Sequence, residues 1–184
     1  AIGSRLVGSE MCIRDSNANY TINVEEEINR MIEKLGINEL FTINLNGIIG
    51  DDTNGHIDNF IRFIDNETIV YFASKDESYC NYQLACRLSK QVKDIVDRSK
   101  IIKQAIPLYH SKDDELIENG KIFPYSKLNF IATTECFIFP CISNNRESLQ
   151  HDLDSLPSKI KIYVINTEAA LTEYGGLHCL TGNI

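Results

Sequence analysis

A histidine, a carboxylate and a cysteine carry the chemistry that this sequence offers. His56 and Asp58 stand two positions apart, after a glycine and at the start of an apolar run. If residues 57–64 form a strand, as their apolar pattern predicts, both side chains project from one face. Cys179 follows Gly175-Gly176-Leu177-His178, where the glycines let a ligand approach the backbone closely. A proton carrier, an anion and a thiol are the functional groups that the active site of a cysteine hydrolase needs.

Each of these residue types has a purely structural alternative. A free cysteine is commonly a small buried hydrophobic residue, so Cys179 is not a nucleophile by its position alone. His56 by itself fits a structural, hydrogen-bonded histidine, and Asp58 by itself fits a strand edge or a cap. Asp51 and Asp52 suit a turn, where aspartate is frequent. His110 and His151 lie in polar surroundings and are expected to be solvated, with His110 near the site only if its loop folds over.

A metal site is the third reading of the same region. Cys136, Cys141, His178 and Cys179 could supply ligands, but no pair of cysteines has the two-residue spacing of a zinc knuckle. No metal and no cofactor is therefore expected.

The composition limits the partners of this chain. Its 184 residues are 43% apolar and 24% charged, which is typical of one globular domain. The net charge is −8 and no basic stretch occurs, which argues against nucleic acid and suits a small cationic ligand. No apolar run approaches the ~20 residues that a membrane helix needs. The 6 cysteines are expected to be reduced thiols in a cytoplasmic protein.

The hydrophobic pattern predicts a repeated unit. Helical spacing is expected over 24–35, ended by Gly36, and a buried strand over 40–45. A strand–strand–helix–strand order then occurs twice, within 57–106 and within 128–165, before a short helix at 168–174. The first unit is expected to end at Pro107, and a long polar loop to cover 108–126. Repeated units that cannot close alone favour a ring or an array.

Two longer motifs make the reading specific. Gly50-Asp-Asp-Thr-Asn-Gly-His-Ile-Asp-Asn-Phe60 and Gly175-Gly-Leu-His-Cys-Leu-Thr181 resemble those of the agmatine deiminase family. This family also holds the bacterial-type peptidylarginine deiminases and belongs to the guanidino-group-modifying enzymes. Residues 124–130 resemble its Ser-Tyr-x-Asn-Phe stretch, with Asn129 matched and Lys127 in place of the tyrosine. The resemblance runs over 17–184.

The resemblance implies a fold and a reaction. The expected fold is α/β: about two and a half strand–strand–helix–strand blades of a five-bladed pentein propeller, with homo-oligomerisation left open. The implied reaction is hydrolysis of a guanidino C–N bond, with agmatine giving N-carbamoylputrescine and ammonia in putrescine and polyamine biosynthesis. Peptidyl-arginine is the alternative substrate, and a non-catalytic binding or assembly fragment is the alternative of another class.

The resemblance also assigns roles to individual residues. Cys179 matches the nucleophile, His56 the general acid–base, and Asp58 a carboxylate that holds the guanidinium. Gly176 and Asn129 match substrate-binding positions. The family's further acidic residues have no counterpart here, so the chain alone is expected to be inactive. Residues 1–16 look foreign to the family and are expected to be an artefactual or disordered tail before a catalytic domain over 17–184.

Overall fold

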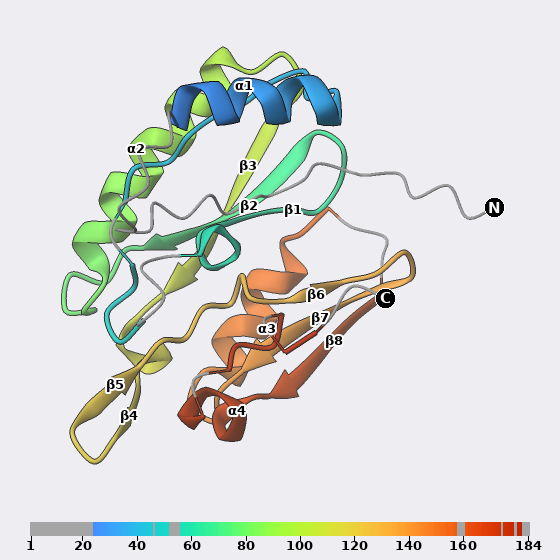
Figure 1. Ribbon diagram of the computed structural model, residues 1–184. Helices are drawn as coiled ribbons and strands as arrows, with labels where there is room; N and C mark the ends of the chain where they lie inside the picture. Colours follow the sequence, from blue (N-terminus) through green and yellow to red (C-terminus); the bar gives the residue numbers. More distant parts are fainter. Residues whose placement is uncertain are drawn as a thin grey trace.

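Two three-stranded sheets, each with its own helix, form the body of the chain (Figure 1). The computed structural model describes residues 24–45, 47–51, 56–157, 161–173, 175–178 and 180–181, and the statements below concern these residues. The prediction for the tail at 1–16 lies outside them. In the part described, no helix is long and apolar enough to cross a bilayer.

The first unit contains β1 (Ile61–Phe63), β2 (Thr68–Ser74), α2 (Tyr82–Arg98) and β3 (Gln104–His110). β1 is antiparallel to β2, and β3 returns parallel to β2 after the helix. The helix α2 packs along this sheet (Figure 1). Its buried side chains recur every three or four positions, as the sequence predicted: Leu84, Leu88, Val92 and Ile95.

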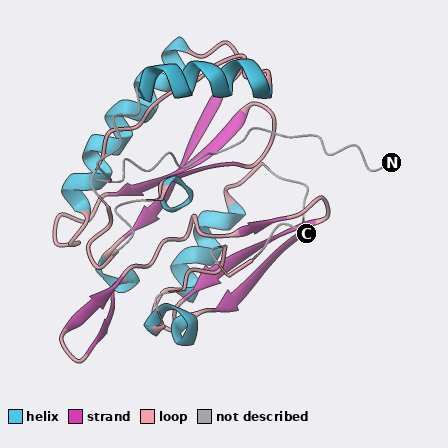
Figure 2. Cartoon of the chain, in the orientation of Figure 1, coloured by secondary structure: helices cyan, strands magenta, loops and turns pink. Residues whose placement is uncertain are grey.

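The second unit repeats this topology. It contains β6 (Ile131–Ala132), β7 (Cys136–Cys141), α3 (Arg146–Asp154) and β8 (Lys161–Asn166). β6 is antiparallel to β7, and β8 is parallel to β7. Figure 2 shows the two sets of strands with a helix beside each. The predicted strand–strand–helix–strand repeat is therefore confirmed.

Six shorter or flanking elements complete the described chain. α1 (Val24–Leu35) precedes the first unit and α4 (Glu168–Thr172) follows the second. Between the units lie a 3₁₀ turn, η2 (Lys112–Asp114), and a hairpin of β4 (Leu116–Glu118) and β5 (Lys121–Phe123), which projects from the body (Figure 1). The segment predicted as one long loop over 108–126 is thus largely structured. Another 3₁₀ turn, η1 (Ile57–Asn59), precedes β1.

The helix α1 ends at the glycine that the sequence predicted. Gly36 has a φ of 62°, in the left-handed region that favours glycine. The Ile37 N–H donates to the Ile32 carbonyl at 3.0 Å, which closes the last turn. A glycine at this position therefore stops the helix where the sequence indicated.

Two strand predictions were wrong. Residues 40–45 form no strand, and the backbone of Asn44 pairs with a side chain instead of a neighbouring strand. The Asn44 N–H donates to Gln91 Oε1 at 2.9 Å, and Gln91 Nε2 donates to the Asn44 carbonyl at 3.1 Å. Pro107 does not end β3 but lies inside it. In the three-stranded sheet β3 is an edge strand, where a residue without an N–H is tolerated.

One apolar core runs through both units. It includes Phe72 and Leu108 from the first sheet, Phe139 from the second, and Leu149 from α3. Phe130, in the segment between the units, stacks on Phe139 with ring centroids 4.4 Å apart. The two units are therefore packed as one body.

His110 is buried in this core, so the prediction that it is solvated was wrong. Its side chain is 1% exposed and stacks on Phe72, with ring centroids 4.0 Å apart. Nε2 accepts the Lys127 N–H at 3.0 Å, so Nδ1 carries the proton and donates to the Leu108 carbonyl at 3.1 Å. Burial, helped by the Lys127 charge, holds the pKa of His110 well below its usual value.

This burial predicts a loss of stability in mild acid. Below about pH 6.5 the unfolded chain protonates His110 while the folded chain does not, so the free energy of unfolding falls as the pH falls. Urea unfolding followed by circular dichroism between pH 7.5 and 5.5 measures this slope. His110→Gln, whose amide oxygen can replace Nε2 as an acceptor, should flatten the slope. An equal slope in both proteins would show that His110 is not the source.

Candidate active site

Asp58 lies in the 3₁₀ turn η1 and not in a strand, which corrects the strand predicted over 57–64. The Asn59 N–H donates to the His56 carbonyl at 3.1 Å, and the Phe60 N–H to the Ile57 carbonyl at 2.9 Å. Pairing with β2 begins only at Ile61. Residues two apart in such a turn do not share a face as they do in a strand. His56 and Asp58 are nevertheless close enough for the His56 charge to lower the pKa of Asp58.

The Asp58 carboxylate is held by two partners from the second half of the chain. Its Oδ2 accepts a hydrogen bond from Asn129 Nδ2 at 3.1 Å and lies 2.7 Å from His178 Nδ1. The Asp58 side chain is 13% exposed, against 39% for His178. Residues 71 and 120 positions away in sequence thus meet on one oxygen atom.

Asn129 connects three segments of the site. Its Nδ2 also lies 3.1 Å from Asn59 Oδ1, and its Oδ1 accepts the His178 N–H at 2.7 Å. The amide therefore joins η1, the segment after β5 and the turn that follows α4. The structure brings together Asn129 and Asp58, two of the predicted substrate-binding residues, and it shows Asn129 bound to protein groups.

Gly176 packs directly on the Asn129 amide. A Cβ atom at this position would lie 2.4 Å from Asn129 Oδ1 and 2.8 Å from its Cγ, far inside van der Waals contact. The predicted substrate-binding glycine thus has a packing reason to be glycine. Its role toward a substrate stays a prediction.

Asp58 is ionised at neutral pH despite its burial. Burial raises the pKa of Asp58, but the hydrogen bond and charge of His178, with the charges of Arg62 and His56, lower it more. The net result is a pKa below the usual value of an aspartate. A partly buried carboxylate in this state can hold a cation.

The segment that carries Asn129 is fixed from the first unit. Ser126 Oγ donates to the Asn59 carbonyl at 2.8 Å. Arg62 on β1 donates from Nη1 to the Phe130 carbonyl at 2.9 Å, and its guanidinium lies 4.6 Å from the centre of the Phe130 ring. No role for Arg62 was predicted from the sequence.

Lys127 fixes the same segment through a buried ion cluster. Its ammonium lies 3.0 Å from Asp152 Oδ2 on α3 and 3.5 Å from Asp114 Oδ2 in η2, and it donates to the Tyr109 carbonyl. The side chains of Lys127 and Asp114 are 1% and 0% exposed. The residue found in place of the family's tyrosine therefore joins β3, η2 and α3.

Cys179 lies outside the described residues, so its role as nucleophile stays a prediction. The turn around it is described on both sides. The Leu180 N–H donates to the Gly176 carbonyl at 3.1 Å, and the Thr181 N–H to the His178 carbonyl at 3.0 Å. His178, which no sequence pattern singled out for catalysis, is the neighbour of Cys179 that reaches Asp58.

The metal alternative receives no support from the described residues. Cys136 and Cys141 are the two ends of β7. An odd separation along a strand places them on opposite faces, about 16 Å apart along the strand axis. In the part of the chain that the structure describes, no group of three or more His, Cys, Asp and Glu side chains could hold a metal ion.

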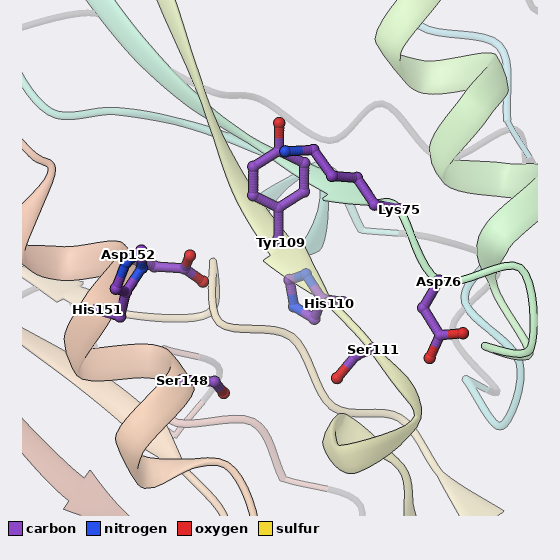
Figure 3. Close-up of a pocket in the computed structure, with 8 residues that line it drawn as sticks. All are labelled: Lys75, Asp76, Tyr109, His110, Ser111, Ser148, His151 and Asp152. Atoms are coloured by element: carbon purple, nitrogen blue, oxygen red, sulfur yellow. The ribbon is translucent and has the colours of Figure 1, made fainter.

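A separate cavity of about 470 Å³ lies at the junction of the two units (Figure 3). Tyr109 and His110 line it from β3, and His151 and Asp152 from α3. His151 is exposed there, as predicted. Among the described residues, His56, Asp58, Asn129 and Gly176 do not line this cavity, and its other described walls are Lys75, Asp76, Ser111 and Ser148.

Comparison with known proteins shows which family the sequence of this chain matches. The description "Porphyromonas-type peptidyl-arginine deiminase" belongs to a family whose profile matches residues 3–184. The chain belongs to this family. The match begins within the segment 1–16 that the sequence analysis set aside.

Curated relatives carry the name of a related enzyme. A "Putative agmatine deiminase" of Legionella pneumophila (strain Paris) is 25% identical over 180 residues, which cover 96% of this chain and 51% of that protein. One of Mycoplasma capricolum is 26% identical over 192 residues, with 96% and 52% covered. The chain thus spans about half the length of the curated relatives it matches.

Solved structures share the α/β fold. An agmatine deiminase of Enterococcus faecalis superposes with a TM-score of 0.79 at 20% identity, covering 94% of this chain and 52% of that one. A C. jejuni agmatine deiminase with substrate bound gives 0.75 at 23% identity, with 90% and 47% covered. At these identities the likeness establishes the fold of the family over this half of its length.

The contact between Gly176 and Asn129 predicts that substitutions at these two positions affect stability in a non-additive way. Gly176→Ala should destabilise the chain by about 1–3 kcal/mol, because the new methyl group overlaps the Asn129 amide. In an Asn129→Ala background the same change should cost much less. Urea unfolding of the four proteins measures the coupling. Equal costs in both backgrounds would mean that Asn129 is not the obstacle.

Substitution of Gly36 is a control that separates steric overlap of a new methyl group from backbone strain. Gly36 has a positive φ, but no atom lies within 4 Å of the place that a Cβ would take there. Gly36→Ala should therefore cost only about 1–2 kcal/mol of left-handed strain, with no dependence on Asn129.

Substitution of the buried Lys127 should destabilise the chain more than the glycine substitutions do. Lys127→Met leaves Asp114 buried without its cation, which should cost about 3–5 kcal/mol in unfolding free energy. Adding Asp114→Asn should recover part of this loss. Lys112→Met, at an exposed lysine, should change stability by less than about 0.5 kcal/mol. A Lys127→Met protein as stable as the parent would show that the ion cluster contributes nothing.

Proposed function

We propose that this chain carries part of the active site of a hydrolase that cleaves a guanidino C–N bond, with agmatine as substrate. The observation that carries the proposal is the ionised, partly buried Asp58 carboxylate, held by Asn129 and by the residue before Cys179. A carboxylate fixed in this way can bind a guanidinium by charge-assisted hydrogen bonds. Family membership and the names of the relatives support the same class of reaction.

The proposed chemistry needs a nucleophile and a proton carrier beside that carboxylate. The Cys179 thiolate attacks the guanidinium carbon and forms a C–S bond. The C–N bond then breaks as His56 donates a proton to the departing ammonia. His56 next takes a proton from water, which attacks the amidino-thioether. Collapse releases the ureido product, N-carbamoylputrescine for agmatine, and regenerates the thiolate.

The geometry of the chain is compatible with these roles. His56 precedes η1, and its charge acts on Asp58. Cys179 directly follows His178, whose ring contacts the same carboxylate. Asn129 and Gly176 complete the proposed substrate-binding set by keeping these two turns together. We extend the proposal to the fold: the two repeated units correspond to blades of a five-bladed propeller.

A labelling experiment tests the proposal without requiring turnover. 2-Chloroacetamidine presents a guanidinium-like cation next to an alkylating carbon. It should label Cys179 faster than neutral iodoacetamide does, agmatine should protect Cys179, and Asp58→Asn should abolish the preference. Mass spectrometry of peptides reports each cysteine separately. Labelling of Cys179 that ignores both agmatine and Asp58 would contradict the proposal.

Other cysteines of the chain serve as internal controls. Burial, with the neighbouring Glu115, raises the pKa of the Cys80 thiol to about 12. Burial also raises the pKa of Cys141. Because the thiolate is the reactive form, both should react slowly with either reagent.

Peptidyl-arginine is the second candidate substrate, because the matching family is described by that activity. Protection of Cys179 separates the two candidates. Agmatine should protect at lower concentration than an acetyl-arginine amide if the substrate is the free amine, and the reverse order would favour the peptide. Turnover by the 184-residue chain alone is expected to be absent or very low. Ammonia release that Cys179→Ala abolishes would contradict that expectation.

A further inference from the structure

We propose that His178 is a positioning residue, whose imidazole fastens the turn that carries Cys179 to the carboxylate that receives the guanidinium. The inference rests on the proposed function and adds a residue to it. Its basis is the 2.7 Å contact between His178 Nδ1 and Asp58 Oδ2.

His178 is attached to the site at two points. Its backbone N–H donates to Asn129 Oδ1 at 2.7 Å, and its ring reaches Asp58 at the same distance. Asn129 in turn donates to the same Asp58 oxygen at 3.1 Å. These three residues form a closed triangle of hydrogen bonds. A shift of His178 would break either its backbone bond to Asn129 or the contact of its ring with the ionised Asp58.

The triangle determines the tautomer of His178. An ionised carboxylate only accepts hydrogen bonds, so Nδ1 must carry a proton. This requirement is met by the neutral Nδ1–H tautomer and by the imidazolium alike. The contact therefore persists whether or not the ring is charged, which suits a positioning role better than that of a proton carrier.

The turn beyond His178 transmits this attachment to Cys179. The His178 carbonyl accepts the Thr181 N–H at 3.0 Å and Thr181 Oγ1 at 2.7 Å. The Leu180 N–H closes on the Gly176 carbonyl. The described residues on both sides of position 179 are therefore tied to each other, and His178 ties them to Asp58. We infer that His178 sets the separation between thiolate and carboxylate.

The same contact between His178 and Asp58 fits a second role, which predicts the opposite change in labelling rate. If the imidazole merely fills the place of a guanidinium, its removal would free Asp58 for the cation. Loss of His178 would then speed the reaction with a cationic reagent. Under the positioning role, its loss slows that reaction.

Three variants distinguish these outcomes. His178→Asn places an amide N–H at the same number of bonds from the backbone as Nδ1. His178→Leu keeps the bulk without a donor, and Asp58→Asn removes the charge. The measured quantity is the ratio of the labelling rates of Cys179 by 2-chloroacetamidine and by iodoacetamide. Circular dichroism and urea unfolding confirm that each variant is folded.

The expected result is a loss in His178→Leu and its rescue in His178→Asn. The rate ratio should fall by about tenfold or more in His178→Leu, the scale of a hydrogen bond to a charged group, and should stay within about threefold of the parent in His178→Asn. In the parent, ¹⁵N NMR should show the His178 ring protonated at Nδ1, and Asp58→Asn should alter this signal.

Two results would overturn the inference. An unchanged or higher ratio in folded His178→Leu removes the positioning role while leaving the proposed function intact. A parent protein without any preference for the amidine, or without protection by agmatine, removes the proposed function and this inference with it.

Discussion

The side-chain amide of Asn129 is the interaction on which the candidate site depends. It donates to the Asp58 carboxylate and to Asn59, and it accepts the backbone N–H of His178. An amide can serve all three because it has both donor and acceptor atoms, which a carboxylate lacks. Without it, the two turns would lose the amide that bonds to both of them and would keep the contact between His178 and Asp58.

Two buried cations hold the Asn129 segment in place. Arg62 donates to the backbone carbonyl of Phe130, one residue after Asn129, and Lys127 lies two residues before it. Each is 5% exposed or less, so each must be matched by carbonyls or carboxylates. Buried charges of this kind contribute little net stability in comparison with apolar packing, but they tolerate few alternative arrangements. Their contribution here is to orientation: the segment has no strand hydrogen bonds of its own at 126–130, and the charged groups take that place.

The helices and the repeat were predictable because their signals are local. Apolar residues at a helical period in α2 bury the same face wherever the helix packs, and Gly36 ends α1 through its own backbone freedom. Strand boundaries were not predictable in the same way. The run after His56 is apolar enough for a strand, but a strand needs a partner, and β2 pairs only from Ile61. The strand predicted over 40–45 also lacks a partner strand, and the Gln91 side chain takes both backbone hydrogen bonds of Asn44 there.

By itself the sequence determined the chemical types in the site and their family. His56, Asp58, Asn129, Gly176 and Cys179 were all proposed from motifs, because motifs preserve residue identity along the chain. Only the tertiary structure decided what the described residues among them touch. It added His178 to Asp58, explained Gly176 by the space that Asn129 fills, and moved His110 from solvent to the core. Burial and long-range hydrogen bonds depend on segments as far as 120 residues apart, and no local pattern specifies which of them will meet.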